Sequence, residues 1–327
     1  MKHLHYYKIA ARTHFELGYT LGKLFKSPSL STYNVILSKM LSVPSLLEKS
    51  GLYLKISKEY FPRYIEELEG YAKGMGVDFH LFWLTFLNEE FDVYPDKCTS
   101  CYAANGQLVG HNEDFDDHYK KRITILEKTI GGVTIFELFY YNGLGGTAAS
   151  VNSFGFTQTV NTLNHTNEQI GVPRNMIARW LSETKDPEGD FQKLKKIPRS
   201  LGYNHTFSFT NGKVWNIEST AKDVRLTTPA IPYVHTNHYL TDLKREEADT
   251  PTTSSHERYN YATSQIGAVL NKSGMKKMLE KTSGLEHDKK KNNTIARFIV
   301  DRALNSVDIW LKREEQKGWI AYSIPHI

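Results

Sequence analysis

The chain has 327 residues, 40% of them hydrophobic and 24% charged, with a formal net charge of +5, which suits one large domain or two smaller ones around a sizeable core. Basic residues form no stripe interleaved with aromatic residues, and no run of about 18 apolar residues occurs, so we expect neither a nucleic-acid partner nor a membrane-spanning helix. The first residues lack the apolar segment of a signal peptide and the chain has only two cysteines, so a reduced, cytoplasmic setting is expected.

The part of the chain before residue 98 has a helical pattern. Thr13 and Glu16 have the spacing of a capping box, and the leucines that follow fall on one helical face. Gly76 stops a later helix, and Asp78 can cap the next one. Pro95 closes the segment. We predict a short strand and then helices, at 4–10, 13–24, 31–42, 63–75 and 78–91.

After residue 98 the pattern changes to β-structure. Asn105-Gly106 is a strong hairpin signal between two short strands. Predicted strands lie at 99–103, 107–110, 123–130, 133–139, 147–152, 156–162, 205–210, 213–218, 222–228, 231–236, 294–301 and 306–312. Predicted helices lie at 173–184, 188–197 and 254–285. Many antiparallel strands with a few helices predict an α+β fold of two packed sheets covered by helices.

Cys98 stands at the boundary between these two patterns. A thiol is a good nucleophile only as thiolate, so it needs a base. An α-amino group has an ordinary pKa of about 7.7 to 8 and can serve as that base. Cleavage of the Lys97–Cys98 peptide bond would place amine and thiol on one residue. We therefore hypothesise that Cys98 becomes a new N-terminus.

Three other interpretations of Cys98-Thr99-Ser100-Cys101 stay open. A redox pair should begin a helix after a strand, whereas strand-like residues follow here. A metal site needs further ligands, and only His235 and His238 have paired spacing. The third interpretation is a structural cysteine without a chemical role.

Two polar residues could join Cys98 in a site. Asp114 follows one hairpin later, so its strand should lie beside that of Cys98, although Asp114 could equally begin a loop with Asp116 and Asp117. Asn237 ends a predicted strand, where its amide could donate to a developing oxyanion. The alternative for Asn237 is an ordinary turn residue.

The order and spacing of several motifs resemble the penicillin acyltransferase-like family of cysteine N-terminal-nucleophile (Ntn) hydrolases, which includes acyl-CoA:6-aminopenicillanic acid acyltransferase. The chain is more distantly similar to conjugated bile acid hydrolases and penicillin V acylases. The motifs that carry the resemblance run from before Cys98 to residue 238: Glu66-Glu67-Leu68-Glu69-Gly70-Tyr71-Ala72-Lys73-Gly74-Met75-Gly76-Val77, Leu87-Asn88, Cys98-Thr99-Ser100, Gly110-His111-Asn112-Glu113-Asp114-Phe115, Asn152-Ser153-Phe154-Gly155-Phe156, Val172-Pro173-Arg174-Asn175 and Val234-His235-Thr236-Asn237-His238.

The resemblance implies an αββα sandwich, two antiparallel sheets between helical layers, and autoproteolysis before Cys98. Residues 1–97 would remain bound as a small subunit, and residues 98–327 would form the catalytic core. Carried over, Cys98 is the nucleophile and its amine the base, Asp114 is the acidic partner of that amine, and Asn237 is the oxyanion-hole residue. Asn161 aligns with a second oxyanion or substrate-binding position.

This sequence departs from the family in two places. Lys97 stands before the nucleophile where the fungal acyltransferase of this family has glycine, and this change bears on the efficiency of self-cleavage. The family's late catalytic-site arginine has three candidates, Arg258, Arg297 and Arg302.

The sequence thus predicts an autoprocessed amidohydrolase or acyltransferase. It would act on linear non-peptide amides or acyl thioesters through an acyl-enzyme on Cys98, with no cofactor and no metal. Its partners would be a small acyl-amide or acyl-CoA substrate and its own leader. The alternative is an uncleaved, catalytically silent binding protein of the same fold, in which Lys97 blocks processing.

Overall fold

A computed structural model describes residues 2–91, 98–141, 143–167, 169–248, 253–282 and 292–325. The helices are α1 (His14–Leu24), α2 (Lys26–Leu41), α3 (Ser45–Tyr60), α4 (Pro62–Met75), α5 (Phe79–Phe86), α6 (Asn88–Phe91), α7 (Arg174–Ser182), α8 (Pro187–Leu194), α9 (Thr253–Ile266) and α10 (Lys272–Thr282). The strands are β1 (Tyr6–Ala10), β2 (Thr99–Ala103), β3 (Leu108–Asp116), β4 (Ile123–Ile130), β5 (Val133–Tyr140), β6 (Ala149–Asn152), β7 (Thr157–Thr162), β8 (Tyr203–Ser208), β9 (Val214–Ser219), β10 (Val224–Thr227), β11 (Tyr233–His235), β12 (Asn292–Asp301), β13 (Ser306–Leu311) and β14 (Ile320–Ser323).

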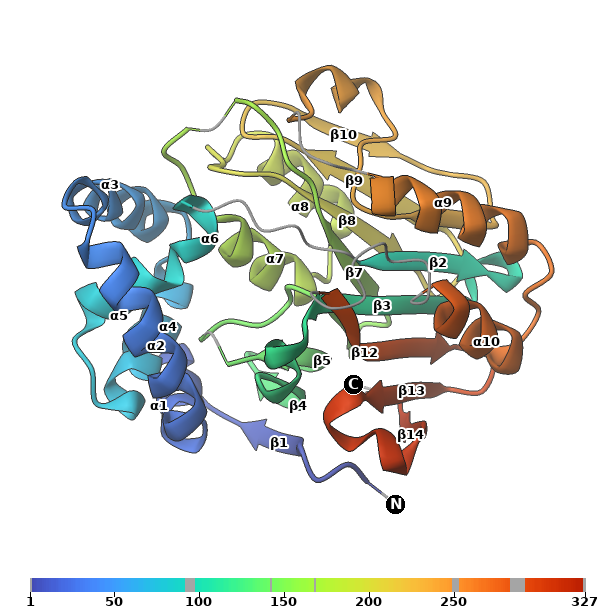
Figure 1. The fold of residues 1–327 in the computed structure, drawn as a ribbon, viewed down its shortest axis with the longest axis horizontal. Coiled ribbons are helices and arrows are strands. Elements are labelled where there is room, and N and C mark those ends of the chain that lie inside the picture. The colour runs from blue at the N-terminus through green and yellow to red at the C-terminus, as the bar shows by residue number, and fades with distance from the viewer. Residues whose placement is uncertain are drawn as a thin grey trace.

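The strands form two sheets that pack face to face. One sheet has the order β1-β4-β5-β6-β7-β8-β9-β10 and the other the order β11-β2-β3-β12-β13-β14. Among these described strands, all pairings are antiparallel except that of β1 with β4, which is parallel. The prediction of two purely antiparallel sheets is therefore wrong at this edge. Helices α9 and α10 lie against the smaller sheet, and the N-terminal helices lie on the opposite side of the molecule (Figure 1). The chain therefore has the αββα layering expected from the sequence.

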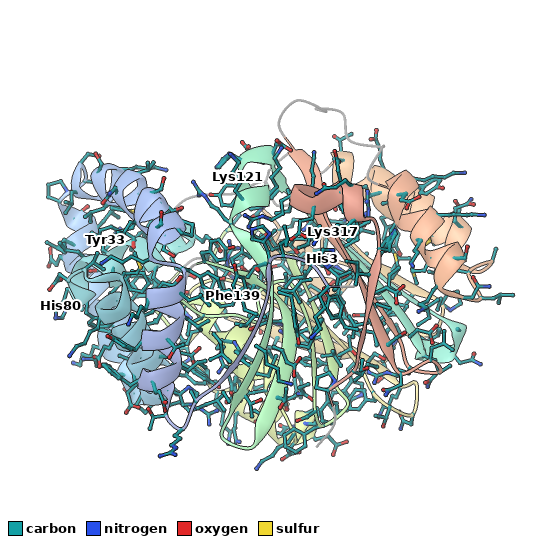
Figure 2. All side chains as sticks on the ribbon, turned by 90° about the horizontal axis from the view of Figure 1, so that it is seen from below. His3, Tyr33, His80, Lys121, Phe139 and Lys317 are labelled. Carbon is teal, nitrogen blue, oxygen red and sulfur yellow. The ribbon has the colours of Figure 1, made fainter. Side chains whose placement is uncertain are left out.

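Alternating side chains hold the layers together. Side chains from both sheets, such as Val109 of β3 and Ile125 of β4, form the central core. A second cluster joins the larger sheet to the N-terminal helices and α7, and a third places β2 and β3 under α9 and α10. Phe139 of β5 packs in the second cluster, and Figure 2 shows it on the sheet side, facing the helical layer that holds Tyr33.

Most predicted elements are confirmed, with their caps. The Thr13 side chain accepts from the Glu16 N–H at the start of α1, and Asp78 does the same for Leu81 at the start of α5. Gly76 ends α4 with a left-handed φ of 78°. None of the helices in the described part of the chain is long and apolar enough to cross a membrane.

Five differences from the predicted elements are found. The helix α3 was not predicted: Gly51 lies in its middle and it buries only a narrow face. The predicted helix at 78–91 breaks at Leu87, and the one at 254–285 breaks before Asn271, whose side chain caps α10 through Gly274. Helix α2 begins at Lys26 rather than near residue 31, and the short edge strand β14 was not predicted.

Candidate active site

A cavity of about 870 Å³, counted to its open mouth, lies where the N-terminal helices meet the two sheets. Helices α2, α5 and α6 supply part of its wall, and residues after Cys98 supply the rest. The lining includes Ile36, Phe86, Glu89, Cys98, Glu113, Phe115, Arg122, Tyr140 and Asn175. A pocket of this kind, mostly apolar with a few converging polar groups, is the usual setting of a small-molecule site.

Cys98 lies at the inner wall of this cavity, immediately before β2. Its backbone N–H donates to Asn237 Oδ1 over 2.9 Å, and its carbonyl oxygen accepts from Arg258 Nη1 over 2.6 Å. Its thiol points to Glu113 Oε2, with 3.6 Å between sulfur and oxygen. Both backbone groups and the thiol of Cys98 are therefore oriented by named partners.

Arg258 fixes this arrangement from helix α9. It is fully buried, and besides Cys98 it donates to Asn237 Oδ1 over 2.9 Å and to Thr99 Oγ1 over 2.9 Å. Of the three arginines left open by the sequence, it is the one that contacts Cys98. Arg297 stacks on the ring of Trp310 instead, and Arg302 bonds to Thr157 and Ser208.

The two asparagines differ in what their amide nitrogens do. Asn237 Nδ2 donates to the Thr162 carbonyl over 3.1 Å, while its Oδ1 faces the Cys98 nitrogen. Asn161 Oδ1 accepts from Ser100 Oγ over 2.9 Å, which ties β7 to β2 across the sandwich. Asn161 Nδ2 is buried and has no hydrogen-bond partner among the described residues. A buried donor without a partner is costly, and the residues on either side of Asn161, Val160 and Thr162, line the cavity.

Asp114 lies beside this cluster on the other face of β3. Its Oδ1 accepts from Thr294 Oγ1 over 2.5 Å, and burial raises the pKa of its carboxyl although nearby Arg258 and Arg297 lower it. Strand residues alternate in direction, so Asp114 faces the α9 and α10 layer while its neighbour Glu113 faces the cavity. The electrostatic attraction between Asp114 and Arg258 links Asp114 to Cys98 indirectly.

Glu113 is a site residue that the sequence analysis did not identify. The β2–β3 register pairs Thr99 with Asn112, which brings Glu113 opposite Cys98. The tight Asn105-Gly106 turn was the available signal, because hairpin geometry sets which residues face each other.

The cysteine pair is divided between two environments. Cys101 is fully buried under α9 and α10, where burial raises its thiol pKa, while Cys98 lines the cavity. The two sulfurs are not joined in a disulfide. Ligand atoms of Cys98, His111 and Glu113 lie within 4.8 Å of one another, a spacing that a metal ion could bridge. These groups already bond to each other, so the geometry of the cluster requires no ion. Lys97 lies outside the described residues.

The αββα layering and the cysteine at the start of an inner strand define the Ntn-hydrolase fold class. The family model for acyl-coenzyme A:6-aminopenicillanic acid acyl-transferase matches residues 101–316. The chain therefore belongs to that family.

Two curated relatives agree with this assignment. The β-alanyl-dopamine/carcinine hydrolase of Drosophila melanogaster is 30% identical over 56% of this chain and 55% of that protein. The 40 kDa form of acyl-coenzyme A:6-aminopenicillanic-acid-acyltransferase of Emericella nidulans is 26% identical over 57% and 54%. The match spans about half the length of each relative.

Solved structures with a similar fold include two bacterial proteins. A mutant of conjugated bile acid hydrolase from Clostridium perfringens is 12% identical, with a TM-score of 0.47 over 70% of this chain and 92% of that chain. Penicillin V acylase from Agrobacterium tumefaciens is 12% identical, with a TM-score of 0.44 over 66% and 83%.

Proposed function

We propose that the chain is an autoprocessed cysteine enzyme that cleaves or transfers the acyl group of a linear non-peptide amide or an acyl thioester. The observation that carries this proposal is the position of Cys98, whose thiol faces the cavity and whose nitrogen and carbonyl are held by Asn237 and Arg258. One relative is named as a hydrolase of β-alanyl-dopamine and carcinine and the other as an acyltransferase of acyl-CoA and 6-aminopenicillanic acid. We carry over only their common step, release of an acyl group to water or to an amine.

In the proposed reaction, cleavage of the Lys97–Cys98 bond frees the amine of Cys98. That amine takes the thiol proton, and the sulfur attacks the acyl carbonyl to form a thioester. Asn161 Nδ2 and Asn237 are proposed to hold the oxyanion, and the protonated amine of Cys98 gives its proton to the leaving group. Water or a second amine then resolves the thioester. Asp114 acts on this centre through Arg258.

The leader, residues 1–97, is proposed to stay bound after cleavage as a small subunit. It supplies the cavity wall from α2, α5 and α6. A buried ion pair also joins the two parts, because Glu67 Oε2 of α4 lies 3.1 Å from Arg179 Nη2 of α7. A leader that left would expose both the charge of Arg179 and the cavity.

Intact-mass analysis of the wild type and of Cys98→Ala tests the proposal. We expect the wild type to give fragments of residues 1–97 and 98–327, and Cys98→Ala to stay whole. An acyl adduct on the larger fragment should appear with acyl-amides or acyl-CoAs. A wild-type chain that stays whole, takes no acyl group and retains a ligand would instead identify the uncleaved binding protein. The cytoplasmic setting stays a prediction, testable by cell fractionation.

A further inference from the structure

The cavity wall beside the Cys98 sulfur carries a carboxylate that the proposed reaction does not use. Glu113 is only 5% exposed, yet it lines the cavity. Its Oε2 lies 3.6 Å from Cys98 Sγ. Any acyl group bound to this sulfur must therefore pass close to the Glu113 carboxylate.

Two neighbours hold the Glu113 side chain in place, and neither of them is a lysine or an arginine. Tyr140 donates its hydroxyl to Oε1 over 2.7 Å, and His111 Nε2 lies 2.9 Å from Oε2. A carboxylate has about four acceptor positions, and the Cys98 thiol takes a third one in the free protein. Once the sulfur is acylated it no longer donates, so two more hydrogen bonds can then form. Within the described part of the chain, Glu113 has no lysine or arginine within ion-pairing distance. A buried carboxylate is stabilised most by a cation, and here the open space for one is on the substrate side.

The other charged groups of the cavity are differently engaged. Glu89 is paired with Arg174 and accepts from Asn175. Arg122 stacks over the ring of Tyr119, with 4.5 Å from the guanidinium carbon to the ring centroid. Of these charged groups, Glu113 is the one that contacts the Cys98 sulfur and can also accept further hydrogen bonds from a bound acyl group.

We infer that the acyl group taken up by Cys98 carries a protonated primary amine one or two carbons from its carbonyl, and that Glu113 selects it. This inference rests on the proposed role of Cys98 as nucleophile. With bonds of about 1.5 Å, the nitrogen of a β-aminoacyl thioester lies at most about 5 Å from the sulfur. That nitrogen can therefore sit within hydrogen-bond reach of Glu113 Oε2. A longer aminoacyl chain would carry its charge past the carboxylate toward the apolar wall.

Thiol labelling tests this recognition directly. Aminoethyl methanethiosulfonate leaves Cys98–S–S–CH2CH2–NH3⁺ and releases methanesulfinate, so its amine stands as many atoms from Cys98 Sγ as that of a β-alanyl thioester. Propyl methanethiosulfonate is the neutral match and the 2-sulfonatoethyl reagent the anionic one. Relative to a free thiol in solution, we expect Cys98 to favour the aminoethyl over the propyl reagent by about 10- to 100-fold, the range of a charge-assisted hydrogen bond. The anionic reagent should be slowest.

The variant Glu113→Gln should remove this preference. A group that only activated the thiol would change the rates of both reagents by the same factor, so their ratio isolates recognition of the amine. Asp116→Asn removes an exposed charge from the same strand and should leave the ratio unchanged. Peptide mapping assigns the label to Cys98 rather than Cys101, and circular dichroism checks that Glu113→Gln folds.

Turnover gives the second measurement. We expect β-alanyl 4-nitroanilide to exceed butyryl 4-nitroanilide in kcat/KM by about 10- to 100-fold in the wild type, and by little in Glu113→Gln. A wild type that labels or turns over the neutral compound as fast as the amine would overturn the inference, whether or not the variant folds. An unchanged ratio in a folded Glu113→Gln would do so too. Labelling needs no cleavage, so an uncleaved, inactive chain that still prefers the aminoethyl reagent would refute the proposed function but support amine recognition by Glu113.

Discussion

The variant Glu67→Gln should weaken the attachment of the N-terminal helices to the rest of the molecule. Glu67 of α4 is fully buried, and its two oxygens accept from Arg179 Nε over 3.2 Å and from Arg179 Nη2 over 3.1 Å. The Oε2 atom also lies 2.8 Å from His14 Nδ1. Glutamine keeps the size of the side chain but leaves the buried guanidinium with less compensation.

Two estimates of the cost agree. Burial raises the pKa of Glu67, but Arg179, His14 and Lys128 outweigh it and bring the value to about 2 from the ordinary 4.5. That difference corresponds to about 3 kcal/mol of stabilisation of the charged form. Removing one partner of a buried ion pair costs about 3 to 5 kcal/mol. We therefore expect Glu67→Gln to lower the free energy of unfolding by about 3 kcal/mol at pH 7.

Urea unfolding followed by fluorescence measures this loss, with Glu69→Gln as the matched control. Glu69 lies on the same helix, is 38% exposed and is 3.8 Å from Lys58, so its removal should change the free energy by less than about 0.5 kcal/mol. In processed protein, native mass spectrometry should show residues 1–97 leaving at lower urea in Glu67→Gln than in the control.

The pH dependence of the free energy of unfolding provides the result that could refute this reasoning. The folded pKa of Glu67 is lowered, so its contribution is complete above about pH 4.5 and is lost as pH falls toward 2. The variant should lack this loss. A Glu67→Gln protein whose unfolding free energy lies within about 1 kcal/mol of the wild type, with the same decline in acid, would show that the ion pair does not hold these helices.

Three further changes test other parts of the structure. Arg258→Lys should reduce kcat by about 100-fold while KM stays near the wild-type value, because lysine cannot hold the Cys98 carbonyl with the same geometry. An unchanged kcat would show that Arg258 does not position Cys98 for the reaction. Burial raises the pKa of Glu90 in the folded protein to about 7, so between pH 4.5 and 7 the folded state keeps a proton that the unfolded state loses. Urea unfolding of the wild type should therefore show the free energy of unfolding falling by up to about 3 kcal/mol over this range. The same decline in Glu90→Gln would contradict this. A Cβ at Gly18 would lie 1.8 Å from a backbone oxygen of α4, so Gly18→Ala should lower the free energy of unfolding by about 3 kcal/mol and lower the melting temperature. Gly51 has open space around it, so Gly51→Ala should raise the melting temperature slightly. Equal effects of the two variants would contradict the close packing of α1 on α4.

Local signals in the sequence predicted most elements of the fold. The cap at Thr13, the stop at Gly76 and the Asn105-Gly106 turn each depend on a few neighbouring residues, so they can be found without knowledge of the rest of the chain. Helix α3 was missed for the same reason, because tertiary packing stabilises it in spite of Gly51. The parallel pairing of β1 with β4 joins residues about 120 positions apart, and no local pattern encodes it.

The candidate site divides in the same way. The position of Cys98 at the change from helical to strand pattern, and the motif containing Asn237, could be identified from the sequence, and the structure brings these two residues into contact. The choice of Arg258 among three arginines could not be made, because it depends on how α9 packs on β2.

By itself the sequence determined the residue types available for chemistry and the order of helices and strands, since both follow from side chains and their near neighbours. Only the tertiary structure decided that Glu113, rather than the adjacent Asp114, shares the cavity with the Cys98 sulfur. The reason is the period of a β-strand: adjacent side chains point to opposite faces, and which face meets the cavity is set by the register of the sheet and the layers packed on it.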